Sequence, residues 1–209
     1  VNGKEANVAE ILAADCTLHT TDIRDVEAMR TLIQGCDHVF HMACLGVRHS
    51  IHSPVENHEV NATATLNLLL LSRELGVARF VYVSSSEVYG TAQLVPQPET
   101  HPTLPMTVYG ASKLAGECYT RAFYRTYDYA TTVIRPFNSY GPRSHHEGDS
   151  GEVIPKFLLR TLAGKPMVVF GDGSQTRDFT FVSDTARGIL EAGLADNTIG
   201  ETINIGSGF

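Results

Sequence analysis

Four apolar, β-prone residues in a row, Phe80-Val81-Tyr82-Val83, end directly in three serines, Ser84-Ser85-Ser86. A run this short and this apolar is typical of a strand that is buried on both faces of a sheet. Open α/β sheets bind their ligands at the carboxyl ends of their strands. We therefore expect the serine hydroxyls to lie at a binding site.

Strand-like and helix-like segments alternate along the rest of the chain. Strands are predicted at 17–21, 38–42, 80–83, 131–134, 168–170, 179–182 and 202–205. Helices are predicted at 8–12, 26–33, 53–76, 109–127, 152–163 and 183–195, and long loops at 43–52, 91–106 and 144–151. This alternation predicts an α/β fold with a parallel sheet covered by helices on both faces.

A tyrosine and a lysine follow the serines at helical spacing. Tyr109 and Lys113 are four residues apart, so both side chains project from one face of the predicted helix. A cation beside a phenol favours the phenolate, so we expect the pKa of Tyr109 to fall from about 10 towards neutrality. Ser85 could hold a substrate hydroxyl against this phenol, which predicts a proton-abstracting site.

Composition places the chain among ordinary globular proteins, with 43% apolar and 19% charged residues. The net charge of −7 is spread along the chain without a basic run, so we expect no nucleic-acid partner. The longest apolar run, Leu68–Leu71, is too short to span a bilayer, and we expect no membrane partner. No secretory leader is visible, and a cytoplasmic protein is predicted.

Neither cysteines nor histidines suggest a metal site. The cysteines are scattered without a Cys-x-x-Cys pair and are expected to be reduced thiols: Cys16, Cys36, Cys44 and Cys118. Adjacent side chains in His145-His146-Glu147 point in different directions, and no third ligand sits at a recognisable spacing. We expect a solvated loop there and no metal.

Several motifs occur in a particular order along the chain. They are Asp22-Ile23-x-Asp25, His41-Met42-Ala43-Cys44, Asn61, Ser84-Ser85-Ser86-Glu87-Val88-Tyr89-Gly90, Tyr109-x-x-x-Lys113, Arg135-x-x-Asn138-x-Tyr140-Gly141-Pro142-Arg143, Phe170-Gly171-Asp172-Gly173 and Gln175-Thr176-Arg177-Asp178-Phe179. Together they resemble the extended short-chain dehydrogenase/reductase family, in its NAD-dependent nucleotide-sugar epimerase/dehydratase branch. The resemblance implies an α/β fold with a doubly wound, Rossmann-like parallel sheet.

The resemblance implies a catalytic set of Ser85, Tyr109, Lys113 and Glu87. Tyr109 would take the proton from a sugar hydroxyl as hydride passes to nicotinamide, and Ser85 would orient that hydroxyl. Lys113 would lower the pKa of Tyr109 and hold the nicotinamide ribose. Glu87 is either a chemical participant or a structural partner of the next loop. Ser86 stands where 4,6-dehydratases carry Asp, which argues against dehydration.

The cofactor implied by the resemblance is NAD. Its implied contacts are Asp22, Ile23, Met42, Ala43, Cys44, Asn61, Ser84, Tyr109, Lys113 and Pro136. Asp22 and Ile23 would contact the adenine, and the backbone of Met42–Cys44 would pass beneath the cofactor. An Asp in this position could also be only a helix cap.

The substrate implied by the resemblance is a nucleotide sugar, with a UDP-sugar as our first choice. Its implied contacts are Ser85, Asn138, Val153, Phe170 and Arg177. Asn138 and Arg177 would bind the diphosphate, for which a guanidinium suits a planar pair of oxygens. Val153 and Phe170 would form walls of the base pocket, although burial in an ordinary core is the alternative.

The resemblance also implies a particular domain organisation. We expect residues 1–151 to form a partial NAD-binding domain that carries the catalytic residues, and 152–209 part of a smaller, interleaved substrate domain. No Gly-x-x-Gly-x-x-Gly motif occurs, so the first β-α-β unit is expected to be missing. These 209 residues alone are then expected to be inactive.

These observations predict an NAD-dependent nucleotide-sugar epimerase of the UDP-glucose 4-epimerase type, which acts through a 4-keto sugar. One alternative is a UDP-glucuronate decarboxylase, because Ser86-Glu87 resembles that group, and another is a 4,6-dehydratase. From a different class, the chain could be a catalytically silent nucleotide-binding relative. The complete enzyme is expected to be a homodimer.

Overall fold

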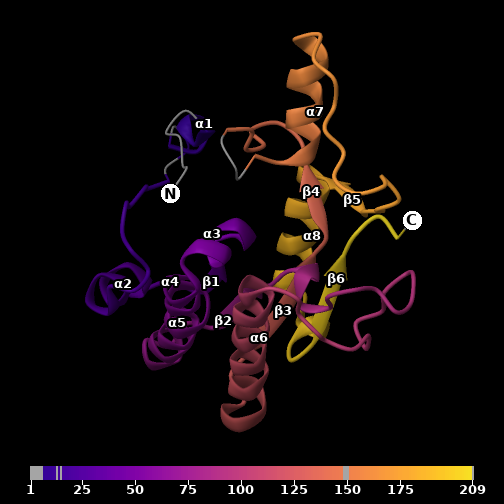
Figure 1. Cartoon of the computed structure of the whole chain (residues 1–209). Helices are drawn as coiled ribbons and strands as arrows, with labels where there is room; N and C mark the ends of the chain where they lie inside the picture. Colours follow the sequence, from indigo (N-terminus) through magenta and orange to yellow (C-terminus); the bar gives the residue numbers. More distant parts are fainter. Residues whose placement is uncertain (1–6, 13, 15, 148–150, 209) are drawn as a thin grey trace.

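The computed structural model describes residues 7–12, 14, 16–147 and 151–208. At its centre is a sheet of four parallel strands in the order β1-β2-β3-β6 (Figure 1). These strands are β1 (His38–His41), β2 (Arg79–Val83), β3 (Thr131–Pro136) and β6 (Thr202–Ile205). The predicted α/β fold with a parallel sheet is confirmed.

Most connections between the strands are helical. The longer helices are α2 (Val26–Ile33), α5 (Ala64–Glu74), α6 (Val108–Tyr127), α7 (Val153–Leu162) and α8 (Val182–Leu194). The shorter ones are α1 (Ala9–Leu12), α3 (Val47–His52), α4 (Pro54–His58), a π-helical segment (Glu59–Thr63) and two 3-10 turns (Ser86–Val88, Asp196–Thr198). The predicted helix over 53–76 is thus found, although a π-helical segment divides it.

All five residues of β2 are buried, and successive side chains of a strand point to opposite sides. Strand β2 is therefore buried on both faces of the sheet. Phe80 and Tyr82 pack in a core with residues of α2, α5 and α6. Val81 and Val83 pack on the other side, in a second core with Ile189 of α8. Helices therefore cover both faces of the sheet, as a doubly wound fold requires.

A second, two-stranded parallel sheet follows β3. It pairs β4 (Asn138–Tyr140) with β5 (Phe179–Phe181) and lies next to α7, at the top of Figure 1. The chain then returns through α8 to β6, which pairs with β3 in the main sheet. The division at residue 151 stays a prediction, and elements from 152–208 contribute to both sheets.

Three expectations for local structure are wrong. Residues 17–21 and 168–170 are exposed and form no strand, since no neighbouring strand of the described chain pairs with them. A strand needs such a partner for its backbone N–H and C=O groups. The predicted loop at 43–52 contains α3.

Candidate active site

Three strands of the main sheet end at one edge, where the predicted catalytic residues lie. β1 leads into Met42–Cys44, β2 into Ser84–Ser86, and β3 ends at Pro136. The three strands are parallel and adjacent, so their carboxyl ends are neighbours. This is the edge at which open α/β sheets bind ligands.

Close packing at a glycine brings α6 to this edge. Ser85 begins a 3-10 turn by accepting a hydrogen bond from the Glu87 N–H, at 3.2 Å. Thr107 caps α6 by accepting from the Gly110 N–H, at 3.0 Å. A Cβ at position 110 would lie 2.7 Å from the Glu87 carbonyl oxygen, so only glycine permits this approach. As a result, Tyr109 lies beside Ser85.

The Tyr109 side chain is half-buried, and it lies close enough to Ser85 and Cys44 for both side chains to affect its pKa. Burial raises the pKa of Tyr109 well above its usual range; Cys44 adds to the rise and the hydrogen bond with Ser85 opposes it. The prediction of a lowered pKa is therefore wrong for this structure. Desolvation of the phenolate is the largest cause of this rise.

Lys113 is 2% exposed and points towards the end of β2. Its ammonium donates a hydrogen bond to the carbonyl oxygen of Val83, at 2.6 Å, and lies 4.5 Å from the centroid of the Tyr82 ring. Burial lowers the pKa of Lys113, although the nearby Cys44 and Glu117 work in the opposite direction. The backbone and an aromatic ring thus hold this cation beneath the catalytic edge.

Asn61 holds the segment that follows β1. Its side-chain amide accepts a hydrogen bond from the Leu45 N–H at 2.8 Å and donates to the Leu45 carbonyl oxygen at 2.9 Å. It also donates to Ser112 of α6, at 3.1 Å, and to Asn57, at 3.2 Å. Asn61 is 1% exposed, and its hydrogen bonds to Leu45 hold the segment that is predicted to bind the cofactor.

The two predicted adenine contacts precede α2. Asp22 is exposed and accepts hydrogen bonds from the Arg24 side chain, the shortest at 2.6 Å, and these lower the pKa of Asp22. Arg24 also lies 3.6 Å from Glu56 of α4. Ile23 packs against the core on the α2 side of the sheet. An ion-pair network therefore positions the Asp22 carboxylate.

The other predicted cofactor contacts lie directly at the carboxyl edge. Met42, Ala43 and Cys44 are exposed, and Met42 keeps 55% of its surface accessible. Ser84 is buried, and its N–H donates to the Ile134 carbonyl oxygen at 2.6 Å. Exposed apolar surface next to a phenol and a cation fits a nicotinamide nucleotide.

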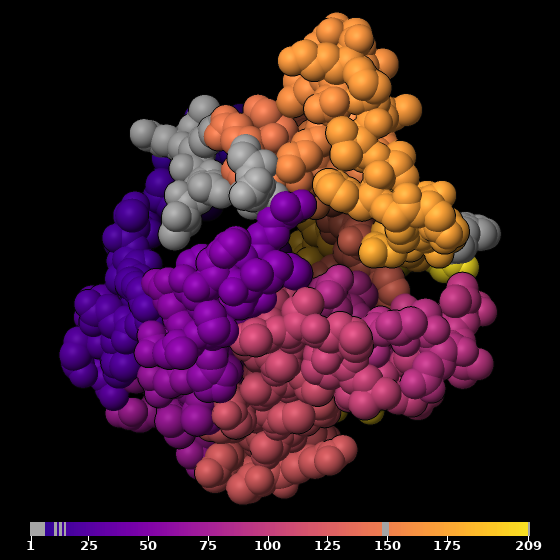
Figure 2. Space-filling view, in the orientation of Figure 1, coloured from indigo at the N-terminus to yellow at the C-terminus, as the bar shows by residue number. Residues whose placement is uncertain are grey.

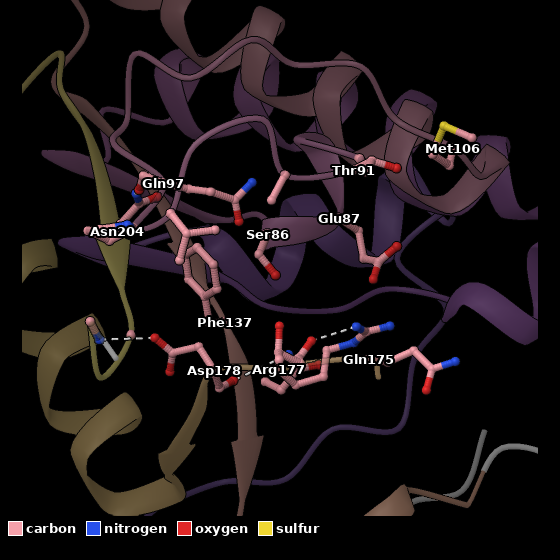
Figure 3. Close-up of a pocket in the computed structure, with 18 of the residues that line it drawn as sticks. Ser86, Glu87, Thr91, Gln97, Met106, Phe137, Gln175, Arg177, Asp178 and Asn204 are labelled. Atoms are coloured by element: carbon pink, nitrogen blue, oxygen red, sulfur yellow. Dashed lines mark hydrogen bonds between the residues drawn. The ribbon is translucent and has the colours of Figure 1, made fainter. Parts of the chain in front are cut away.

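A cavity of about 720 Å³ opens beside Ser86 and Glu87, the two residues after Ser85. Asn138 and Arg177, the predicted diphosphate contacts, also line it. Figure 2 shows a hollow between the orange region around α7 and the magenta region, and Figure 3 shows Glu87 and Arg177 on opposite sides of the cavity. Of the predicted catalytic residues, Glu87 therefore lines the same cavity as the predicted diphosphate contacts, whereas Ser85, Tyr109 and Lys113 are not among the residues that line it.

The two predicted base-pocket residues have different surroundings. Val153 lines a second cavity of about 360 Å³, which Asn138 and Arg177 also line. Phe170 is 79% exposed, and among the described residues its carbonyl oxygen accepts a hydrogen bond from Gln175. The structure therefore joins Val153, but not the ring of Phe170, to the predicted substrate contacts.

Four polar residues that line the large cavity are not among the predicted site residues: Gln97, Gln175, Asp178 and Asn204, which Figure 3 labels. Gln175 and Asp178 lie within the motif Gln175–Phe179, whereas Gln97 and Asn204 carry no sequence signal. Asp178 accepts hydrogen bonds from the Ser207 and Gly208 N–H groups, at 2.9 and 3.0 Å. Gln97 comes from a loop and Asn204 from β6, far apart in sequence, so no spacing rule connects these two.

The sequence also does not predict the contacts of a buried hydrogen-bond network behind the cavity. Arg135 donates to Tyr89, at 2.8 Å, and to the Glu99 carbonyl oxygen, at 3.1 Å. The Tyr89 hydroxyl donates to Asn204, at 2.7 Å, and the Asn204 amide donates to the Gln97 carbonyl oxygen, at 2.9 Å. This network holds the proline-rich loop that forms one wall of the cavity.

Among the described residues, no group of three or more His, Cys, Asp or Glu side chains could hold a metal ion. None of the helices in the described part of the chain is long and apolar enough to cross a membrane.

Comparisons with known proteins agree with this arrangement. The chain is 37% identical over 172 residues to a UDP-glucose 4-epimerase of Mycolicibacterium smegmatis, covering 81% of this chain and 54% of that protein. It is 35% identical over 170 residues to UDP-glucuronic acid decarboxylase 4 of Arabidopsis thaliana, covering 78% of this chain and 38% of that protein. The chain thus spans about half or less of the length of these relatives.

Solved structures show the same fold. A UDP-glucose 4-epimerase of Thermotoga maritima, solved with UDP-glucose, superimposes with a TM-score of 0.90 at 33% identity, over 100% of this chain and 67% of that one. A UDP-N-acetylglucosamine 4-epimerase of Methanobrevibacter ruminantium, solved with UDP-N-acetylmuramic acid, gives 0.93 at 30% identity, over 100% and 66%. The pattern of one family matches residues 2–206, which confirms the predicted resemblance. The chain belongs to the NAD dependent epimerase/dehydratase family.

Proposed function

We propose that this chain carries the catalytic site of an NAD-dependent nucleotide-sugar epimerase, of the UDP-glucose 4-epimerase type. The observation that carries the proposal is that Tyr109 lies near enough to Ser85 for that side chain to affect its pKa, at the end of the strand that leads into a cavity lined by Glu87, Arg177 and Asn138. Proton-transfer groups and diphosphate ligands are the two requirements of this chemistry, and the proposal assigns them to these neighbouring positions.

The residues have distinct roles in this proposal. Ser85 donates a hydrogen bond to the sugar 4-hydroxyl and holds it against Tyr109. Tyr109 acts as the base that takes the proton from O4, and the C4–O4 bond becomes a ketone as the C4 hydrogen leaves as hydride. The proposal requires the bound ligands and the Lys113 charge to offset the burial that raises the pKa of Tyr109. When bound at the strand ends, NAD would supply the acceptor and donor of the hydride. Lys113 favours the phenolate by its charge.

The remaining predicted contacts position the two ligands. Asp22 and Ile23 receive the adenine, while Met42–Cys44, Ser84 and Pro136 line the path of the cofactor at the strand ends. Asn61 keeps that path in place through Leu45. Arg177 and Asn138 bind the diphosphate, and Val153 contacts the base. The homodimer, the cytoplasmic location and the lack of nucleic-acid or membrane partners stay predictions.

A UDP-glucuronate decarboxylase is the second candidate. Glu87 is exposed at the large cavity, where a carboxyl group could act next to a 4-keto acid, and the similarity to a plant decarboxylase supports the same choice. A 4,6-dehydratase needs an acid where Ser86 stands. A catalytically silent relative would have no use for Ser85, Tyr109 and Lys113 together.

The test is an assay of the full-length protein with NAD and a panel of nucleotide sugars. Interconversion of UDP-glucose and UDP-galactose, or of their N-acetylated forms, is the expected result. Release of carbon dioxide from UDP-glucuronate would favour the second candidate, and loss of water from a dTDP- or UDP-hexose would favour dehydration. Tight binding of nucleotide sugars without turnover of any of them would contradict the proposal.

A further inference from the structure

Tyr82, in the middle of β2, is fully buried and makes two contacts with Lys113. Its hydroxyl donates a hydrogen bond to the backbone carbonyl oxygen of Lys113, at 3.2 Å. Its ring lies under the Lys113 ammonium, with Nζ 4.5 Å from the ring centroid. One side chain therefore contacts both the backbone and the charged end of the predicted catalytic lysine.

A glycine in α6 makes room for Tyr82. A Cβ at Gly116 would collide with the Tyr82 hydroxyl oxygen and the ring carbon that carries it. The helix backbone consequently lies directly on the phenol, within reach of its hydrogen bond. Lys113 and Tyr109 lie on adjacent turns of one helical face, so the contact that fixes the first residue also restrains the second.

The Lys113 ammonium is held from several elements. Val83 accepts its hydrogen bond at 2.6 Å, and the Tyr82 ring lies beneath it. The other ionisable groups that act on this side chain are His41 of β1, Cys44 after β1 and Glu117 of α6. A buried ammonium loses its hydration shell, so the negative face of an aromatic ring stabilises it more than it would at the surface.

We propose that Tyr82 is a positioning residue for the active site: its ring holds the ammonium of Lys113 at the carboxyl edge of the sheet, and its hydroxyl fixes the turn of α6 that carries Lys113 and Tyr109. The proposal rests on the proposed function for its catalytic consequence. Its physical part, the stabilisation of the charged lysine by the ring, can be measured without turnover.

The experiment measures the pKa of Lys113 in the full-length protein, by NMR of ¹⁵N-labelled lysine side chains, with Lys113→Arg to assign the signal. In Tyr82→Leu, which removes the ring, we expect this pKa to fall by about one unit, since cation–π stabilisation at a desolvated site is worth roughly a tenfold change in protonation. In Tyr82→Phe, which removes only the hydroxyl, we expect a fall of less than about 0.3 unit.

The matched control is Tyr129, a buried tyrosine of the same core. Tyr129→Leu also removes a buried ring, so it should destabilise the fold as Tyr82→Leu does, but it should not change the pKa of Lys113. Should Tyr82→Leu not fold, fluorinated phenylalanines at position 82 replace it, because fluorine weakens the negative face of the ring while nearly keeping its shape. A stepwise fall of the Lys113 pKa with each added fluorine is then expected.

Turnover gives a second reading. If the proposed function holds, Tyr82→Leu should lower kcat about tenfold and shift its pH profile by about one unit, with KM for the nucleotide sugar unchanged. Equal Lys113 pKa values in Tyr82→Leu and Tyr129→Leu, or no trend with fluorination, would overturn the inference. Absence of any nucleotide-sugar turnover would overturn the proposed function, while the NMR result would still decide the role of Tyr82.

Discussion

The guanidinium of Arg135 and the carboxylate of Glu117 face each other through two parallel hydrogen bonds, Nε to Oε1 at 2.8 Å and Nη2 to Oε2 at 2.6 Å. Both side chains are buried, with 3% and 0% of their surface exposed. Arg135 belongs to β3 and Glu117 to α6. The pair thus connects the strand before the predicted diphosphate ligand to the helix that carries Tyr109, the predicted catalytic tyrosine.

Breaking this pair from one side should be costly. Glu117→Leu leaves the Arg135 charge buried without its carboxylate, and we expect the free energy of unfolding to fall by about 3–5 kcal/mol. The double variant Glu117→Leu with Arg135→Met should recover much of this loss, since it removes both charges. Urea unfolding of the two single variants and the double variant measures the difference. Additive losses in the double variant would contradict the interpretation as a coupled pair.

The pH dependence of stability should depend on His41. Burial lowers the pKa of His41 from 6.5 to about 3, with a smaller contribution from the Lys113 charge. Thr65 donates to the Asn61 carbonyl oxygen, so His41 Nε2, 2.8 Å from the Thr65 hydroxyl oxygen, is the donor in that contact. Between the two pKa values the unfolded chain binds a proton that the folded one does not. The contribution of neutral, buried His41 to the free energy of unfolding is therefore fully present above about pH 6.5, and it is lost as the pH falls towards 3.

As the pH falls from 7.5 to 5.5, protonation of His41 in the unfolded chain alone should lower the free energy of unfolding by about 1.4 kcal/mol. His41→Gln, which can keep a hydrogen bond to Thr65 but does not titrate, should show a correspondingly smaller pH dependence in urea unfolding. Identical pH dependence in the two proteins would mean that His41 is protonated in the folded state.

Tyr109→Phe tests the proton acceptor. In the full-length protein this change should lower turnover of the nucleotide sugar by about 10² or more, the usual scale for general acid–base catalysis. Binding of the nucleotide sugar, measured by calorimetry, should be nearly unchanged because the ring remains. Near-normal turnover would remove Tyr109 from the mechanism.

Arg177 tests the position of the substrate. Its side chain lines both cavities, and as a diphosphate ligand its loss in Arg177→Ala should weaken UDP-sugar binding by about 1.5–3 kcal/mol. Arg187→Ala, on the exposed side of α8, removes an equal charge away from the cavities and should have little effect. If UDP affinity survives the loss of Arg177, the diphosphate lies elsewhere.

Glu87 separates the two candidate enzymes. An epimerase needs only hydride transfer and proton exchange at one hydroxyl, so Glu87→Gln should reduce its turnover by no more than a few-fold. A decarboxylase also expels carbon dioxide from a 4-keto acid, and an acidic neighbour would matter more there. Carbon dioxide release from UDP-glucuronate that disappears in Glu87→Gln would favour the decarboxylase over the epimerase.

Local patterns were sufficient for much of the fold. The apolar run Phe80–Val83 and the four-residue spacing of Tyr109 and Lys113 each depend on neighbours in the chain, and both appear in the structure as predicted. Residues 17–21 and 168–170 have equally suitable strand compositions but form no strand. Strand formation depends on a partner from elsewhere in the chain, which composition does not report.

The sequence by itself determined which groups stand at the carboxyl edge of the sheet, because a strand end and a helix start are set by local preference and the order of elements. Only the tertiary structure decided the surroundings that set their pKa values. Burial disfavours the phenolate of Tyr109, and the ammonium of Lys113 lies over the ring of Tyr82, in each case because of residues distant in sequence. The pairing of Arg135 with Glu117 and the hold of Asn61 on Leu45 likewise depend on distances across the fold, which spacing along the chain does not encode.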